Sequence, residues 1–342
     1  MRRIISFIAI TAFIVLLAGC PVSPRRGTIS NGGGGGTGGQ LYVSTANSIL
    51  HFNNAETSSG NIAPVSTITG SNTQLSAPQH LFLDAPNDRL YVANQGGSSV
   101  LVFDGVSTLS GTVNPTPTRV LFGAATHLTA PLDVTLDPTN NLLYVADGTS
   151  ILVFAGASTV SGNTPPVRNI NMGISIGGLF LDAPNNQLYV SDPGDNAVDR
   201  LDGASSQDVV GVVGGAIAGA DTKLSQPRGL ALDGSGRLLV SNSAAPASIT
   251  VYPNANVATG DQIPTVTISG SSTLLRAPGQ IALNRSVGTG ELFVLDPLAA
   301  SILIFTNAPT NGGNVAPART ITGSNTGITA SAVNGLAIDP TR

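Results

Sequence analysis

Apolar and polar residues alternate along most of this chain. Within residues 81–103, apolar side chains recur at every second position in three short runs, at 81–83, 90–92 and 100–102. A period of two residues is the pattern of β-strands, in which successive side chains point to opposite faces. After the first twenty residues no segment shows the helical period, so the pattern predicts an all-β protein.

The alternating unit is repeated. Residues 81–94 return as 134–147 and 179–192, weaker copies follow at 230–242 and 281–296, and one more copy begins at residue 336. Counted from their first acidic or amide residue, the copies start 45 to 55 residues apart, at Asp84, Asp137, Asp182, Asp233, Asn284 and Asp339. A period of this size is typical of a repeat architecture.

Each repeat predicts four strands. The first strand ends in Asp-Ala-Pro-Asn or Asp-Pro-Thr-Asn, whose side chains and fixed proline torsion favour a turn. A second strand of the Leu-Tyr-Val type follows, then a third such as Ser99–Phe103 and an outer one such as Thr118–Leu121. Four-stranded units at this spacing are typical of β-propeller blades, which stand radially around a central channel.

The two ends of the repeat region complete one another. The stretches Leu41–Val43, Ser48–Phe52 and Val65–Thr69 match strands two, three and four of a repeat, whereas Asn334–Asp339 matches strand one. Together they make a sixth blade, and this pairing leaves no open sheet edge. We therefore predict a six-bladed β-propeller of four-stranded antiparallel blades, closed by its N- and C-terminal strands.

Residues 78–103 and 131–154 carry the pattern Pro-x-x-Leu-x-Leu-Asp, Leu-Tyr-Val-Ala-Asp and Ser-Val-Leu-Val-Phe with small variations. This pattern resembles the NHL-type and related lactonase-like six-bladed propellers, and the resemblance extends over residues 41–342. It implies the fold and leaves the activity open, because this fold carries hydrolases, lyases and pure binding platforms alike.

The N-terminal residues predict export and a membrane anchor. Met1-Arg-Arg precedes an apolar run at 4–18, and Leu17-Ala-Gly-Cys20 closes it, so residues 1–19 are typical of a signal peptide. The closing motif resembles the lipobox of bacterial lipoproteins, which implies that Cys20 is lipidated and becomes the new N-terminus. The alternatives are an uncleaved anchor or an ordinary secretion signal. Residues 20–40 contain five consecutive glycines and predict a flexible tether before the propeller at 41–342.

Composition and sorting signals indicate in which compartment the protein is expected. Pro21 stands where an aspartate would suggest inner-membrane retention, so the outer membrane or cell surface is favoured. Charged residues are 10% of the chain and Lys223 is the single lysine. With Arg2 and Arg3 removed, 13 basic side chains stand against 19 acidic ones, a net charge of −6. This balance excludes nucleic-acid binding, which needs a basic surface. We expect a monomeric ring.

Acidic and amide residues recur at two turns of the repeat. We expect the aligned Asp84, Asp137, Asp182, Asp233 and Asp339 to hold hairpins. We expect the residues that end the second strands to close the following turn in the same way, namely Asn94, Asp147, Asp192, Asn242 and Asp296. A residue repeated around a ring is usually structural.

The candidate functional residues lie where one repeat differs from the others at the same position. Four residues before the aligned acidic residue, three repeats have glycine, whereas the others have His80, Asp133 and Gln280; Arg228 and Asn334 lie one residue earlier in their repeats. All five positions begin innermost strands, so they lie near one mouth of the channel. Convergent polar groups in a concave site can bind a small ligand. We predict a ligand-binding site here; the alternative is a solvated funnel without a ligand.

Most catalytic and metal-binding motifs are absent from the sequence. It lacks a phosphate-binding loop, a His-Glu-x-x-His motif and a second cysteine. The resemblance points to zinc-dependent lyases with several channel histidines and to calcium-dependent lactonases with a Glu, Asn and Asp set, but this chain has only three histidines and two glutamates. Asp133 and Asn334 could supply part of a calcium site, which needs six or more oxygen ligands. We predict no catalytic residue, no metal and no cofactor.

These observations favour a lipid-anchored, exported propeller that serves as a binding or scaffold module of the cell envelope, with a protein or glycan partner. The alternative is a lactonase-like hydrolase acting at the channel mouth. A third hypothesis is a structural component of an envelope assembly, in which the outer loops rather than the channel carry the function.

Overall fold

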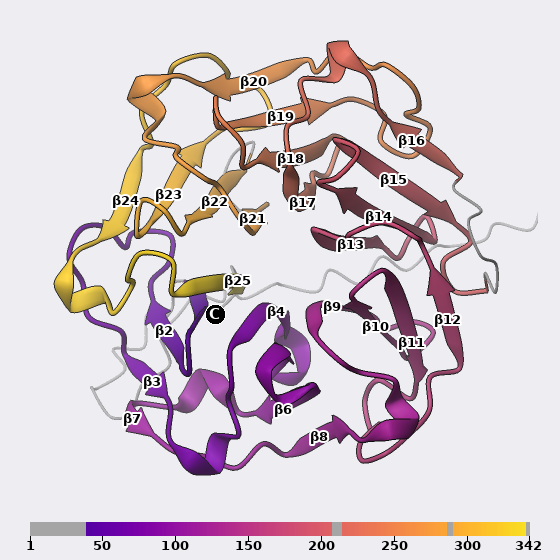
Figure 1. Ribbon diagram of the computed structural model, residues 1–342. Coiled ribbons are helices and arrows are strands. Elements are labelled where there is room, and N and C mark those ends of the chain that lie inside the picture. Colours follow the sequence, from indigo (N-terminus) through magenta and orange to yellow (C-terminus); the bar gives the residue numbers. More distant parts are fainter. Residues whose placement is uncertain (1–38, 207–213, 286–289, 340–342) are drawn as a thin grey trace, which may run out of the picture. The chain divides into compact units, whose positions relative to one another are not determined.

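The computed structural model describes residues 39–206, 214–285 and 290–339 (Figure 1). These residues all belong to one compact unit, Gly35–Arg342. Cys20, the predicted signal peptide and nearly all of the predicted tether lie outside the described residues. Gln40, the last residue assigned to the tether, already begins the first strand. Within the described ranges, no helix has the length and apolarity that a bilayer span requires.

Six sheets surround a centre, and each has four antiparallel strands in the order inner to outer. Blade 1 holds β25 (Val333–Asp339), β1 (Gln40–Thr45), β2 (Ile49–Asn53) and β3 (Ser66–Ile68). Blade 2 holds β4 (Pro78–Asp84), β5 (Arg89–Asn94), β6 (Ser99–Asp104) and β8 (Arg119–Phe122). Blade 3 holds β9 (Pro131–Asp137), β10 (Leu142–Asp147), β11 (Ser150–Ala155) and β12 (Arg168–Asn171).

Blade 4 holds β13 (Gly178–Asp182), β14 (Gln187–Asp192), β15 (Ala197–Asp202) and β16 (Gly215–Ile217). Blade 5 holds β17 (Pro227–Leu232), β18 (Leu238–Asn242), β19 (Ser248–Tyr252) and β20 (Val266–Ser269). Blade 6 holds β21 (Ile281–Asn284), β22 (Glu291–Asp296), β23 (Ser301–Thr306) and β24 (Arg319–Thr322). The short strand β7 (Gly111–Val113) joins blade 1 as a fifth strand.

Single turns of 3-10 helix lie in the connections. They are η1 (Ser71–Thr73), η2 (Ala85–Asn87), η3 (Gln95–Gly97), η4 (Val106–Thr108), η5 (Ala124–Thr126), η6 (Ala220–Thr222), η7 (Ser271–Thr273) and η8 (Ser324–Thr326).

The predicted ring closure is confirmed. β25 pairs with β1 in antiparallel register, with Leu41 opposite Ile338 and Val43 opposite Leu336. Figure 1 shows β25 beside the first strands of the chain, at the centre of the ring. The predicted all-β, six-bladed propeller is therefore the observed fold.

The hydrophobic core lies between the blades rather than inside one sheet. Along β5, Tyr91 and Ala93 belong to the core shared with blade 3, whereas Leu90 and Val92 belong to the core shared with blade 1. The second strand of a blade is thus covered on both faces, which explains its uninterrupted apolar sequence. Six such cores, one at each blade boundary, stabilise the ring.

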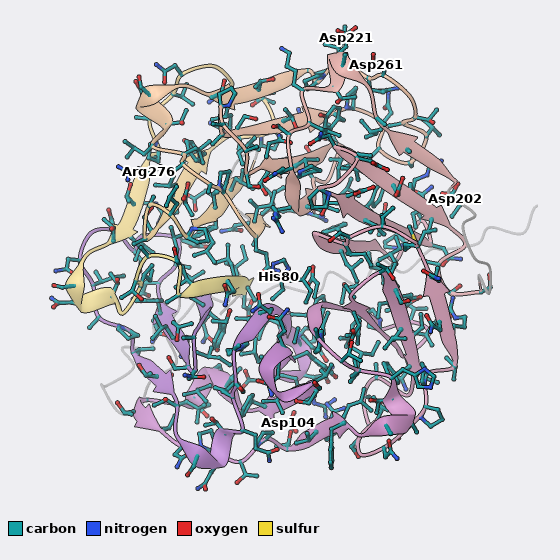
Figure 2. The ribbon with its side chains drawn as sticks, in the orientation of Figure 1. His80, Asp104, Asp202, Asp221, Asp261 and Arg276 are labelled. Atoms are coloured by element: carbon teal, nitrogen blue, oxygen red, sulfur yellow. The ribbon has the colours of Figure 1, made fainter. Side chains whose placement is uncertain are left out.

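An outer link between blades was not predicted from the sequence. The loop between strands three and four of a blade reaches back to the outer strand of the preceding blade, through β7 on β3 and through isolated parallel bridges at Gly60, Gly162, Gly260 and Gly313. A nearby side-chain oxygen accepts a backbone N–H from the preceding blade over 2.7–2.9 Å, at Asn61, Asn114, Asn163, Asp261 and Asn314. Figure 2 shows one such pair, Asp221 and Asp261, at the outer edge.

The recurring acidic residues largely hold turns, as expected. Asp137 accepts the N–H groups of Thr139 and Asn140, both over 3.0 Å. The residues that end the second strands follow the prediction only in part. Asn94, Asp147 and Asn242 accept N–H groups of the loop that precedes the innermost strand. Those side chains tie the entry of the innermost strand to the end of the second strand, and so position the channel mouth.

Candidate functional site

The innermost strands of neighbouring blades are linked where they begin, and glycine permits the link in three blades. The Ser44 hydroxyl accepts the Gly335 N–H over 2.7 Å and donates to the Gln79 carbonyl of the next blade over 2.7 Å. Ser241 makes the corresponding bonds to Gly229 and to Gly279 of the next blade. A Cβ on Gly335 would lie 2.3 Å from the Gln79 oxygen, so the close approach requires glycine.

The other three blades replace this serine and glycine pair with a polar side chain on the innermost strand. Ala93, Ala146 and Leu295 stand where the serines would be. Asp133 Oδ2 accepts the Leu179 N–H of the next blade over 2.7 Å, and Gln280 Oε1 accepts the Leu336 N–H over 2.5 Å. The polar residues that break the glycine pattern therefore bridge blades as well.

His80 completes this inner set. Its Nδ1 lies 3.0 Å from Asp133 Oδ2, without the alignment of a hydrogen bond, and both residues are buried. Figure 2 places His80 at the centre of the ring. An imidazole near a carboxylate can exchange a proton with a ligand in a neighbouring space.

A hollow of about 480 Å³ lies at the mouth where the innermost strands begin. Its polar side chains come from blades 1, 2 and 5 and the loops that adjoin them, and comprise Gln79, His80, Gln226, Arg228, Ser243, Ser331 and Asn334. Asn334 donates to the Pro78 carbonyl over 3.1 Å, which holds its amide at the rim. Arg228 is half-buried, and its guanidinium has no hydrogen-bond or ion-pair partner within the described residues.

A second hollow, of about 320 Å³, lies further along the channel. Leucine, isoleucine, alanine and phenylalanine side chains of the innermost strands line it, together with Asp133, Gln280 and Arg285. His80 lines the mouth and Asp133 lines the channel, so the pair separates the two spaces.

The structure thus divides the five predicted site residues. His80, Arg228 and Asn334 come together at the mouth. Asp133 and Gln280 lie behind them, on the channel side, where each is engaged by a backbone N–H of the next blade. The prediction that these residues bind a ligand stays a prediction.

Sequence reasoning missed several mouth residues. Gln226, Ser243 and Ser331 also line the hollow. Ser243 directly follows Asn242 at the end of a second strand, so the loops after these strands were the signal that could have identified it. His51 lies elsewhere, stacked on Tyr42 with ring centroids 4.5 Å apart. Burial lowers the pKa of His51 to about 4.

In the part of the chain that the structure describes, no group of three or more His, Cys, Asp or Glu side chains is arranged to hold a metal ion. The Asp133 carboxylate accepts the N–H groups of Val134 and Leu179, and each of these bonds uses one of its two oxygens.

Comparisons with known proteins show the fold. No family model and no curated protein matches this sequence. The structure is similar to one in the nidogen–laminin complex, with 14% identity, a TM-score of 0.58, and coverage of 88% of this chain and 98% of the other. It is also similar to two proposed 6-phosphogluconolactonases at 14% identity. The one from Bacteroides fragilis has a TM-score of 0.56, with 89% and 98% covered; the one from Bacteroides uniformis has 0.53, with 87% and 84% covered. At such identity the likeness concerns the propeller alone.

Proposed function

We propose that this protein is a binding module of the cell envelope that recognises an anionic group of a protein or glycan partner at the channel mouth. Arg228 carries the proposal, because its half-buried guanidinium, which has no partner among the described residues, lines the mouth hollow in a chain of net negative charge. A desolvated arginine gains most from a carboxylate or phosphate, which it can bind through two parallel hydrogen bonds. The nearby amides of Gln79 and Asn334 add donors and acceptors for a polar ligand.

The proposal includes the anchor. Lipidation of Cys20 would keep the propeller at a membrane on the outer side of the cell, with the tether between them. A net negative domain without a basic stripe would then meet its partner through local contacts at the mouth rather than through a broad electrostatic surface.

Isothermal titration with glucuronate and with a short aspartate peptide tests the mouth, with glucose as the uncharged control. We expect an acidic probe to bind, and Arg228→Ala to weaken it at least about tenfold, since charged hydrogen bonds contribute that much or more. Lys223→Gln, at an exposed cation outside the mouth, is the matched control and should leave binding unchanged. Absence of binding by both acidic probes, or equal binding by the two variants, would contradict the proposal.

The contact between His80 and Asp133 favours a second candidate function. A histidine close to a carboxylate can take a proton from water that attacks an ester or lactone. Two neighbours of similar fold are proposed lactonases, although at 14% identity this adds little. Hydrolysis of a lactone and ester panel, lost in His80→Gln and retained in His127→Gln, would establish a hydrolase. Equal rates in the two variants would exclude His80 as the base.

A further inference from the structure

A third hollow, of about 350 Å³, lies between blades 5 and 6, away from the mouth. Its lining combines three leucines with polar residues of the η7 turn and of strands β23 and β24, namely Ser271, Leu274, Leu275, Arg276, Ala299, Ser301, Leu303, Thr320 and Thr322. Figure 2 shows Arg276 near β24, well separated from His80 at the centre. The hollow is therefore distinct from the proposed mouth site.

The repeat departs from its own pattern at Arg276. At the corresponding position the other blades carry a small hydroxyl residue, as in Ser76, Thr129, Ser225 and Thr329. Thr129 uses that hydroxyl to bond Asp147 of its own blade over 2.5 Å. Arg276 retains the backbone part of this arrangement, donating its N–H to Asp296 over 2.6 Å. Its guanidinium, by contrast, has no partner in the described part of the chain.

A second departure leaves a buried hydroxyl unsatisfied. In blades 2 and 5 the asparagine that ends the second strand donates to the serine opposite it, Asn94 to Ser99 over 2.9 Å and Asn242 to Ser248 over 3.3 Å. Blade 6 has Asp296 there, and its oxygens accept the N–H groups of Arg276, Ala277 and Ala299. Ser301 is 3% exposed, and its Oγ has no hydrogen-bond partner among the residues that the structure describes.

An unsatisfied buried hydroxyl costs free energy unless a ligand or water supplies its bond. The same hollow offers a positive charge at Arg276 and an apolar wall, including Leu274, which is 51% exposed. We propose that this hollow is a second binding site, for a small organic acid with an apolar body. The carboxylate pairs with Arg276 and receives the Ser301 O–H, and the apolar body covers the leucines.

Titration of the full-length protein with benzoate and hexanoate tests the site, with benzamide as the uncharged counterpart of benzoate. We expect at least one acid to bind, with affinity reduced at least about tenfold in Arg276→Ala and severalfold in Ser301→Ala. Benzamide should bind at least about tenfold more weakly than benzoate. Lys223→Gln, at an exposed cation outside both hollows, should leave the affinity unchanged. Absence of binding by both acids, an affinity that Arg276→Ala leaves unchanged, or an equal loss in Lys223→Gln would overturn the proposal.

Thermal unfolding gives an independent readout that needs no ligand. Because the Ser301 hydroxyl has no partner, Ser301→Ala should leave the melting temperature equal or higher. Ser99→Ala removes a bond that is made and should lower it. Equal losses in the two variants would show that the Ser301 hydroxyl is already satisfied, and would also overturn the proposal.

Discussion

His80 Nδ1 lies 3.0 Å from Asp133 Oδ2 across the boundary between blades 2 and 3. The same carboxylate oxygen accepts the Leu179 N–H of blade 4, so one side chain contacts both neighbouring blades. Residues that appear in the sequence as candidates for ligand binding are therefore also part of the inner ring of links between blades. Their substitution should alter stability as well as any binding.

Asp133→Ala should destabilise the protein by about 1–3 kcal/mol, because it leaves the Leu179 N–H buried without an acceptor. Urea unfolding measures this difference. The control is Asp221→Ala, since Asp221 is exposed and contributes only its backbone N–H to the outer link. Similar unfolding midpoints for the two variants would mean that the Asp133 link contributes nothing to the ring.

Gly335→Ala should lower stability by about 1–3 kcal/mol or more, because the new Cβ would lie 2.3 Å from the Gln79 oxygen and the two inner strands would have to separate. Thermal unfolding checks this expectation. Gly234→Ala is the matched control, as a Cβ there meets nothing within 4 Å and the backbone is outside the left-handed region. An unchanged melting temperature in Gly335→Ala would show that the close approach of β25 to β4 is not needed for ring closure.

Asp199 should make stability depend on pH. It occupies a third-strand position held by leucine in four other blades, is 9% exposed, and has no partner in the described residues. Burial, with smaller contributions from Asp192 and Asp195, raises its pKa to about 6. The folded state therefore binds a proton more tightly than the unfolded state, and Asp199 destabilises the fold increasingly as the pH rises from about 4 to above 6.

Asp199→Asn removes this titration. We expect the variant and the parent to be similarly stable near pH 4 and the variant to be more stable at pH 7.5, by up to about 2–3 kcal/mol for a shift of about two pKa units. Urea unfolding across this pH range gives the difference, with exposed Asp221→Asn as control. A difference that stays constant with pH would contradict the assignment.

Cys20→Ser should release the protein from the membrane fraction or leave an unprocessed precursor, because the lipid is the predicted anchor. Fractionation and mass spectrometry of the N-terminus distinguish these outcomes. Ser23→Ala, three residues later, is the control and should behave as the parent does. Unchanged processing and membrane association in Cys20→Ser would refute lipidation.

The strands, the blade count and the closing pair were predictable because they depend on local properties of the sequence. Period-two alternation marks each strand, and the copies of Asp84 mark each blade at a near-constant spacing. The partial repeats at Leu41 and Leu336 complement one another, which predicted their pairing. These features are present in the linear order of residue types, so no contact had to be known.

Only the tertiary structure decided what the inner residues do. The Ser44 hydroxyl links the strand of Gly335 to the next blade, and Asp133 makes such a link without a serine. In both cases the hydrogen bond to the next blade ends on a backbone atom. A backbone carbonyl or N–H carries no residue identity, so no sequence pattern marks it as a partner. Only the structure likewise showed that the side chains of Arg228 and Ser301 have no hydrogen-bond partner among the described residues. Hydrogen bonding depends on distances between atoms, which sequence spacing does not contain.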